Sequence, residues 1–321
     1  MAHRASASAW RIAEACASPR RYPVAHRGAR VPARCRSASR ATAQPQHSGF
    51  AFSFRDANAD AASLRAHYER EGWVVVRGVA DAALIDALQA ATDALQKEAE
   101  TFTRSRRHRG VFFETQSASG RKSEEAVRPG ALRKIGAPSK RGGAFAALVR
   151  SERIQRIARR LCFGGTSDSR DSPKLRCAVD QVNTKAPDSE GSGFAWHQDA
   201  SFLKPLARAE FDEHGGVNVV VALDRSDDAN GGFEVLGRTH VEGEAPKTLR
   251  DAYDGATESV AKLQSESSPI FDESYRRCPT LAPGDAVFFH PMLAHGSGRN
   301  ASTRRRRIAT LWYVGHACSS T

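Results

Sequence analysis

Trp196-His197-Gln198-Asp199 is the most informative stretch of this chain of 321 residues. It places an imidazole and a carboxylate two residues apart in a segment that reads as extended. On a strand, residues i and i+2 point to the same face, so His197 and Asp199 can converge on one metal ion. Gln198 then points to the other face and is not a ligand candidate.

A third ligand is available in Pro291-Met292-Leu293-Ala294-His295-Gly296-Ser297-Gly298, which follows the apolar run 286–289. His290 and His295 both qualify, and spacing alone does not choose between them. Two histidines and one carboxylate with the remaining positions open form the facial triad that binds non-haem Fe(II).

Four arginines, Arg304-Arg305-Arg306-Arg307, head a strand pattern at 308–314. A guanidinium group can hold a carboxylate through two parallel hydrogen bonds. The pattern therefore indicates a clamp for an organic acid co-substrate close to the metal site.

The order of these motifs is more specific than any one of them, since a lone His-x-Asp is a weak signal. A strand with Gln181-Val182-Asn183-Thr184-Lys185 comes first, then the His-x-Asp, Asn230-Gly231-Gly232-Phe233, Pro283-Gly284-Asp285 and the distal histidine with the arginines. With this set the chain resembles the phytanoyl-CoA dioxygenase family, the Fe(II)- and 2-oxoglutarate-dependent oxygenases, over about residues 64–314.

The resemblance implies a double-stranded β-helix (a jelly roll, cupin-like) with the metal near one open end. It implies Fe(II) as the metal, 2-oxoglutarate and O2 as co-substrates, and hydroxylation of a small organic or lipid-like molecule with release of succinate and CO2. Family members that halogenate replace the carboxylate ligand with a small residue. Asp199 therefore favours hydroxylation or another oxidation.

The resemblance also assigns individual residues. In the family the distal metal ligand is the histidine of a His-Gly-Ser-Gly segment, which here is His295, and this leaves His290 a structural role. The co-substrate clamp lies eleven residues later, at Arg306. The other three arginines are expected to form a solvated basic cluster: Arg304, Arg305 and Arg307.

Further co-substrate contacts are expected around the clamp. Gln181 and Asn183, on one face of a strand, resemble the polar pair that contacts 2-oxoglutarate, although they could also be a buried, mutually satisfied amide pair. Ser297 could add a hydroxyl hydrogen bond. Lys134 could meet an anionic ligand or be merely solvated. Asn218 is a weaker candidate, because relatives often carry a bulky aromatic residue nearby, where this chain has Val219, Val220 and Val221.

Short strand patterns dominate the second half of the chain, and helical patterns the first. Strands are expected at 73–77, 175–184, 193–196, 217–223, 233–236, 286–289 and 308–314, and helices at 63–71, 82–100 (with Asp81 as N-cap) and 151–161. The expected class is mainly β with flanking α-helices. Residues 101–143 should form loops and edge strands near the site mouth, and residues 248–272 a lid or a surface insertion.

The first 50 residues have nine arginines, no lysine and one acid, Glu14. This composition is typical of an organelle transit peptide, so we expect residues 1–48 to be a transit peptide or disordered basic leader and residues 49–321 the oxygenase domain. The expected location is a mitochondrion or plastid after leader removal, with the cytoplasm as the alternative. A basic tail that binds nucleic acid is also possible on composition alone.

Charge and cysteine content restrict the class of partner. The leader carries +8 of the formal net charge of +12, so residues 51–321 carry only +4 and lack basic clusters interleaved with aromatic residues. No Cys-x-x-Cys pair and no run of 18 apolar residues occurs. We therefore expect a small-molecule substrate, no nucleic acid, no membrane span and no obligate protein partner. The alternatives are a catalytically silent jelly-roll binding protein and an oxygenase acting on nucleic acid.

Overall fold

The computed structural model describes residues 51–117, 124–164, 174–189, 192–241 and 272–316. All of them belong to the compact unit of residues 47–321. The predicted leader and residues 248–271 of the predicted lid or insertion lie outside the described residues.

A large sheet of nine strands forms the base of the fold. Its neighbours pair antiparallel, except for a parallel pair at one edge. Across the sheet the strands are, in order, β1 (Ala51–Ser53), β2 (Trp73–Arg77), β11 (Ala286–Phe289), β8 (Gly216–Ala222), β13 (Arg306–His316), β6 (Lys174–Lys185), β5 (Leu132–Gly136), β4 (Val111–Thr115) and β3 (Arg106–His108).

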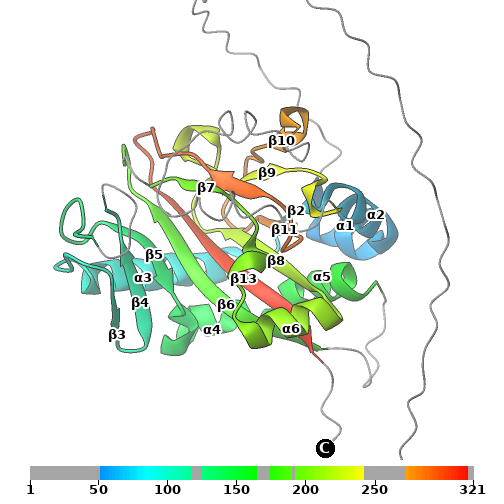
Figure 1. The fold of residues 1–321 in the computed structure, drawn as a ribbon, viewed down its shortest axis with the longest axis horizontal. Coiled ribbons are helices and arrows are strands. Elements are labelled where there is room, and N and C mark those ends of the chain that lie inside the picture. Colours follow the sequence, from blue (N-terminus) through cyan, green and yellow to red (C-terminus); the bar gives the residue numbers. More distant parts are fainter. Residues whose placement is uncertain (1–50, 118–123, 165–173, 190–191, 242–271, 317–321) are drawn as a thin grey trace, which may run out of the picture. The chain divides into compact units, whose positions relative to one another are not determined.

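A second sheet of four strands faces the large one: β10 (Arg276–Arg277), β9 (Glu234–Leu236), β12 (His295–Ser297) and β7 (Phe194–His197). In Figure 1, β7, β9 and β10 run above the long strands β6 and β13. An apolar cluster that includes Val220, Phe233, Val235, Phe289 and Ile308 lies between the sheets. Two antiparallel sheets packed face to face form the predicted jelly roll.

Helices cover the outer face of the large sheet and close the main core, which contains Leu88, Ile157, Val219 and Leu311. They are α1 (Phe54–Ala59), α2 (Ala61–Glu71), α3 (Ala82–Glu98), α4 (Gly143–Val149) and α5 (Glu152–Phe163). A further helix, α6 (Pro205–His214), packs through Phe211 against Val314 of β13 in a separate cluster. Asp81 caps α3 as predicted, because its side chain accepts the Leu84 amide at 2.9 Å. Helices α1, α4 and α6 were not predicted from the sequence.

Period-two alternation along β13 separates the two faces of the large sheet. Arg306, Ile308, Thr310 and Trp312 all point to the cavity between the sheets. Arg307 points the other way and is 1% exposed, so its predicted place in a solvated cluster is wrong. Its guanidinium donates to Asp224 and, at 2.7 Å, to Asp93 of α3, which ties the sheet to the helix layer. The two remaining arginines of that cluster are exposed, as predicted: Arg304 and Arg305.

The described part of residues 101–143 contains edge strands, as predicted. β3 lies at the free edge of the large sheet, and β4 and β5 connect it to β6. A short 3-10 helix, η2 (Pro138–Arg141), follows β5. The register of β5 sets Lys134 beside Asn183, which brings that lysine to the cavity. Within the described ranges, no helix is both long and apolar enough to cross a membrane.

Candidate metal and co-substrate site

His197, Asp199 and His295 meet between the two sheets. β7 ends at His197, β12 begins at His295, and the two histidines are paired across these strands. Asp199 lies just beyond β7, as the first residue of the 3-10 helix η3 (Asp199–Phe202), rather than on the expected strand. Its Oδ1 nevertheless lies 3.4 Å from His197 Nε2 and 3.5 Å from His295 Nε2. One atom from each residue lies within 4.8 Å of the others, so the three could hold one metal ion.

Hydrogen bonds orient both imidazoles. His197 Nδ1 is 2.7 Å from the Ala195 carbonyl, and His295 Nδ1 is 2.9 Å from the Leu293 carbonyl. A carbonyl oxygen only accepts, so each Nδ1 carries the proton and each Nε2 keeps its lone pair for a metal. Burial, together with the neighbouring His295, lowers the pKa of His197.

The carboxylate is also held in its charged form. Burial alone would raise the pKa of Asp199, but His295 and His197 lower it below its ordinary value. Metal ligands of this kind must be a deprotonated carboxylate and neutral imidazoles, so the lowered pKa values of Asp199 and His197 fit a site for a divalent cation.

Asn218 holds the other oxygen of the same carboxylate. Its Nδ2 donates to Asp199 Oδ2 at 2.7 Å, and both side chains are buried. Asn218 was expected as a weaker co-substrate contact, whereas its amide bonds the metal ligand Asp199. Asp199 Oδ1 therefore faces the histidines while Oδ2 is occupied.

His290 lies apart from this group. Its Nδ1 accepts the Met292 amide at 3.1 Å, and its ring packs near Tyr68, Phe211 and His240. Burial and the nearby His240 lower the pKa of His290 to about 4. Its neutral ring is thus part of the packing, in agreement with the structural role that the sequence analysis gave it.

Arg306 lies fully buried on the cavity wall. Its Nε and Nη2 donate to the Gly231 carbonyl, whereas Nη1 has no hydrogen-bond partner among the described residues. Burial lowers the pKa of Arg306 to about 10, so the group stays charged at neutral pH. A buried, charged donor without a partner fits a carboxylate ligand, because leaving such a group unpaired is costly.

The backbone at Gly231 shows why the Asn230-Gly231-Gly232 motif has a glycine at this position. Its φ is +69°, in the left-handed region that favours glycine, and an added Cβ would lie 2.6 Å from the Gly298 carbonyl oxygen. The bare backbone lets its carbonyl reach Arg306 and also Lys185, whose Nζ lies 3.1 Å from the same oxygen.

Lys185 is a site residue that the sequence analysis missed. It is 1% exposed and pairs with Arg306 across β6 and β13. Its Nζ donates to Ser297 Oγ at 2.8 Å and to the Gly298 carbonyl. Because it follows Asn183 by two residues on the same strand, period-two alternation could have placed it on the cavity side.

The remaining predicted co-substrate residues, Gln181, Asn183, Ser297 and Lys134, line the same cavity of about 140 Å³. Asn183 Nδ2 bonds Thr310 Oγ1 at 3.3 Å, so the alternative of an amide pair bonded to Gln181 is not what the structure has. Lys134 Nζ is paired with the buried Glu114 at 3.1 Å. Cavity residues that the sequence analysis did not single out include Phe194, Phe202, Phe233, Thr310 and Trp312.

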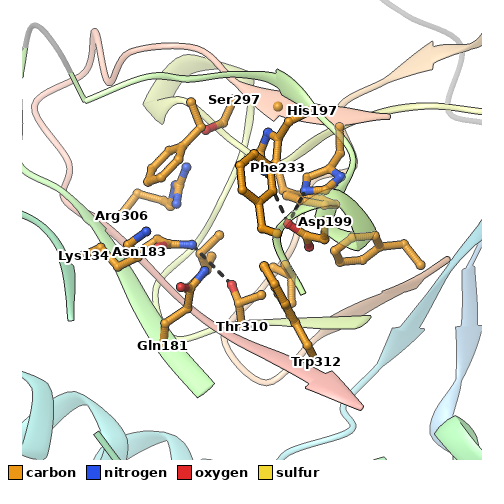
Figure 2. Close-up of a pocket in the computed structure, with 17 residues that line it drawn as sticks. Lys134, Gln181, Asn183, His197, Asp199, Phe233, Ser297, Arg306, Thr310 and Trp312 are labelled. Carbon is orange, nitrogen blue, oxygen red and sulfur yellow. Dashed lines mark hydrogen bonds and ion pairs between the residues drawn. The ribbon is translucent and has the colours of Figure 1, made fainter. Parts of the chain in front are cut away.

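Figure 2 shows the two ends of this arrangement. Arg306, Lys134 and Ser297 lie on one side of the cavity, and the metal-binding group lies on the other. The donor set of two imidazoles and one carboxylate fits Fe(II), and the unpaired Arg306 Nη1 fits the distal carboxylate of 2-oxoglutarate.

Comparisons with known proteins agree with this geometry. The family Phytanoyl-CoA dioxygenase (PhyH) matches residues 68–308. An L-proline trans-4-hydroxylase of Streptomyces griseoviridis is 31% identical over 145 residues, which are 41% of this chain and 52% of that protein. The peroxisomal phytanoyl-CoA dioxygenase of Rattus norvegicus is 29% identical over 163 residues, 49% of this chain and 42% of the relative. The chain thus aligns with about half the length of these curated relatives.

Solved structures share the fold at lower identity. The epimerase SnoN, crystallised with Fe3+, alpha ketoglutarate and nogalamycin RO, superposes with a TM-score of 0.52 at 22% identity, covering 80% of this chain and 84% of SnoN. EctD from S. alaskensis with bound Fe gives a TM-score of 0.52 at 20% identity, covering 79% of this chain and 76% of EctD. Since the family match spans well over half of the sequence, the chain belongs to the phytanoyl-CoA dioxygenase family.

Proposed function

We propose that this protein is an Fe(II)- and 2-oxoglutarate-dependent dioxygenase that hydroxylates a small organic or lipid-like molecule and releases succinate and CO2. The observation that carries the proposal is the pairing of two features in one cavity. Three buried metal-ligating atoms lie within 4.8 Å of one another, and a buried guanidinium with an unpaired Nη1 lines the same space.

The protein's own groups have distinct tasks in this proposal. Arg306 orients the co-substrate by its distal carboxylate, and Lys185 fixes the Ser297 hydroxyl beside it. Phe194, Phe233 and Phe289 give the cavity apolar walls that exclude water. Bound Fe(II), with 2-oxoglutarate and O2, would supply the oxidising chemistry.

Asp199 bears on the type of oxidation. Its carboxylate occupies the position that halogenating relatives leave to a small residue, and Asn218 holds it there. Hydroxylation is therefore the reaction that we propose. Fold and family do not fix the substrate, because one scaffold serves many substrates.

Succinate formation tests the proposal directly. The purified protein is loaded with Fe(II), supplied with 2-oxoglutarate and O2, and assayed against a panel of small metabolites, amino acids and acyl thioesters. We expect one class of compounds to raise succinate formation and to gain an oxygen atom. Binding of metal and 2-oxoglutarate without succinate from any member would instead indicate a silent jelly-roll binding protein.

We also propose that residues 1–48 direct the protein to a mitochondrion or plastid and are removed there. Their arginine-rich, acid-poor composition supports this. Fusion of residues 1–48 to a fluorescent protein tests the proposal. Diffuse cytoplasmic fluorescence would contradict it.

A further inference from the structure

In the part of the chain that the structure describes, three side chains on the cavity wall have a buried polar atom without a hydrogen-bond partner: Arg306 Nη1, Asn183 Oδ1 and Trp312 Nε1. The first two belong to the co-substrate end described above. Trp312 is not explained by the metal or by 2-oxoglutarate. An indole N–H is a donor only, and a buried one usually has an acceptor.

The position of Trp312 places it on the metal side of the cavity. It lies six residues beyond Arg306 on the same face of β13, roughly 20 Å along an extended strand. Its cross-strand partner on β8 is Asn218, which holds the metal ligand Asp199. Figure 2 shows Trp312 on the side of Asp199, across the cavity from Arg306. A substrate must be next to the metal and clear of the co-substrate, so Trp312 lies where a substrate would bind.

The charges on the cavity wall restrict what can bind there. Apart from the imidazoles, the charged side chains among the described lining residues are Lys134, Asp199 and Arg306. Lys134 is paired with Glu114, Asp199 would serve the metal, and Arg306 would serve 2-oxoglutarate. No charge on the described wall is left over for a substrate. Burying an unpaired charge is costly, so the bound part of the substrate should be uncharged.

Aromatic surface and limited space define the rest of the subsite. Phe202 lines the cavity, and 38% of its surface is exposed. The centroid of its ring lies 5.8 Å from that of His197, in an edge-to-face arrangement. The cavity of about 140 Å³ resembles in size one that holds a benzene molecule. Once 2-oxoglutarate occupies the clamp, only a small group can reach the metal, and the rest must extend past Phe202.

Resting on the proposed function, we propose that Trp312 is a substrate-binding residue for an uncharged molecule. Its Nε1 donates to a carbonyl, amide or hydroxyl oxygen of the substrate, and the apolar body of the substrate lies against the rings of Trp312 and Phe202. A free carboxylate or ammonium group is excluded from this end of the cavity.

Calorimetry on protein loaded with Mn(II) and 2-oxoglutarate tests the inference. The probes are cyclohexanecarboxamide and cyclohexanecarboxylate, which differ in charge but hardly in shape, and L-proline as a zwitterion. We expect the amide to bind at least tenfold more tightly than either charged probe. Trp312→Phe keeps the ring but removes the N–H, and should weaken amide binding about five- to tenfold with the 2-oxoglutarate affinity unchanged. Trp73→Phe, in the neighbouring core, is the control.

The outcomes separate this inference from the function on which it rests. Native protein that fails to bind 2-oxoglutarate would refute the proposed function and this inference with it. If 2-oxoglutarate binds, the inference alone is overturned when a charged probe binds as well as the amide, when no probe binds, or when Trp312→Phe matches the native protein. The comparison of probes needs no variant, so it stands even if Trp312→Phe folds poorly.

Discussion

Asn218 Nδ2 lies 2.7 Å from Asp199 Oδ2, in a contact closed to solvent on both sides. This single hydrogen bond leaves Asp199 Oδ1 to face the two histidines at 3.4 and 3.5 Å. Asn218 therefore sets the orientation of the carboxylate before any metal binds, as partners of metal ligands commonly do.

Asn218→Ala should weaken metal binding about 10- to 100-fold, the usual cost of losing a partner of a metal ligand. The Mn(II) affinity from calorimetry measures this, and the melting temperature of the metal-free variant reports the structural cost separately. A variant with native Mn(II) affinity would show that Asp199 keeps its orientation unaided.

Asp199→Ala should abolish metal binding and succinate formation while leaving the fold intact. The residue lies beyond the end of β7, so its loss removes one ligand and no strand hydrogen bond. His290→Ala is the matched comparison, because it should lower the melting temperature without removing metal binding. Succinate formation by Asp199→Ala would show that Asp199 is not a metal ligand. Loss of metal binding by His290→Ala would mean that the distal ligand has to be decided again between His295 and His290.

The sequence predicted best what depends on local pattern. Asp81 as a helix cap, the strand at 286–289 and the shared face of Gln181 and Asn183 follow from capping chemistry and period-two alternation. The choice of His295 over His290 came from the resemblance, since both histidines are equally reachable on spacing.

Contacts between elements distant in the sequence could not be predicted in this way. Arg307 is buried because Asp224 and Asp93 meet it, and no local signal announces those partners. Asn218 on β8 bonds Asp199 on η3, 19 residues away in the sequence, so its role depends on how these two elements pack together. Alternation could have placed Lys185 on the cavity side, but not its three acceptors.

The lowered pKa of His290 predicts that the folded protein loses stability in mild acid. Its pKa of about 4 in the folded protein is below the ordinary histidine value of 6.5. Above pH 6.5 both states are neutral and the fold keeps its full stability. As the pH falls from 6.5 to about 4, the unfolded chain takes up the proton first, so stability decreases by roughly 3 kcal/mol for this group.

Urea unfolding of the metal-free protein between pH 8 and pH 4 measures the effect. His290→Gln should flatten the decline, because glutamine does not titrate. Equal slopes for His290→Gln and native protein would mean that His290 takes up its proton over the same pH range in the folded and the unfolded state.

Lys185→Met tests whether the hydrogen bonds of Lys185 help to hold the residues around Arg306 in place. Methionine keeps most of the length but loses the donor for Ser297 Oγ and for the carbonyls of Gly231 and Gly298. The Gly231 carbonyl keeps its bonds from Arg306, but the other two acceptors lose this donor, at about 1–3 kcal/mol for each buried acceptor left unpaired, so the melting temperature should fall. The 2-oxoglutarate affinity should also fall, while Mn(II) affinity stays near native. A selective loss of metal affinity would contradict this division of roles.

Arg306→Ala should weaken 2-oxoglutarate binding at least about tenfold, because losing a charge-assisted hydrogen bond costs on the order of 1.5–3 kcal/mol. Lysine at this position should rescue only partly, since a point charge cannot reproduce the planar guanidinium. Calorimetry on Mn(II)-loaded protein measures both variants, and neither should change the Mn(II) affinity.

Arg305→Ala is the better control for Arg306→Ala than Arg304→Ala. Arg305 is exposed and pairs with Asp93 on the surface at 3.1 Å, an interaction that screening makes weak. Arg304 instead binds both oxygens of Asp227, which is the N-cap of the short helix η4 (Asp228–Asn230). The C-cap of this helix is Gly231, whose carbonyl accepts the hydrogen bonds of Arg306. Arg304→Ala should therefore have an intermediate effect on 2-oxoglutarate affinity, and Arg305→Ala none. A large effect of Arg305→Ala, with none for Arg306→Ala, would mean that the co-substrate does not use the buried face of β13.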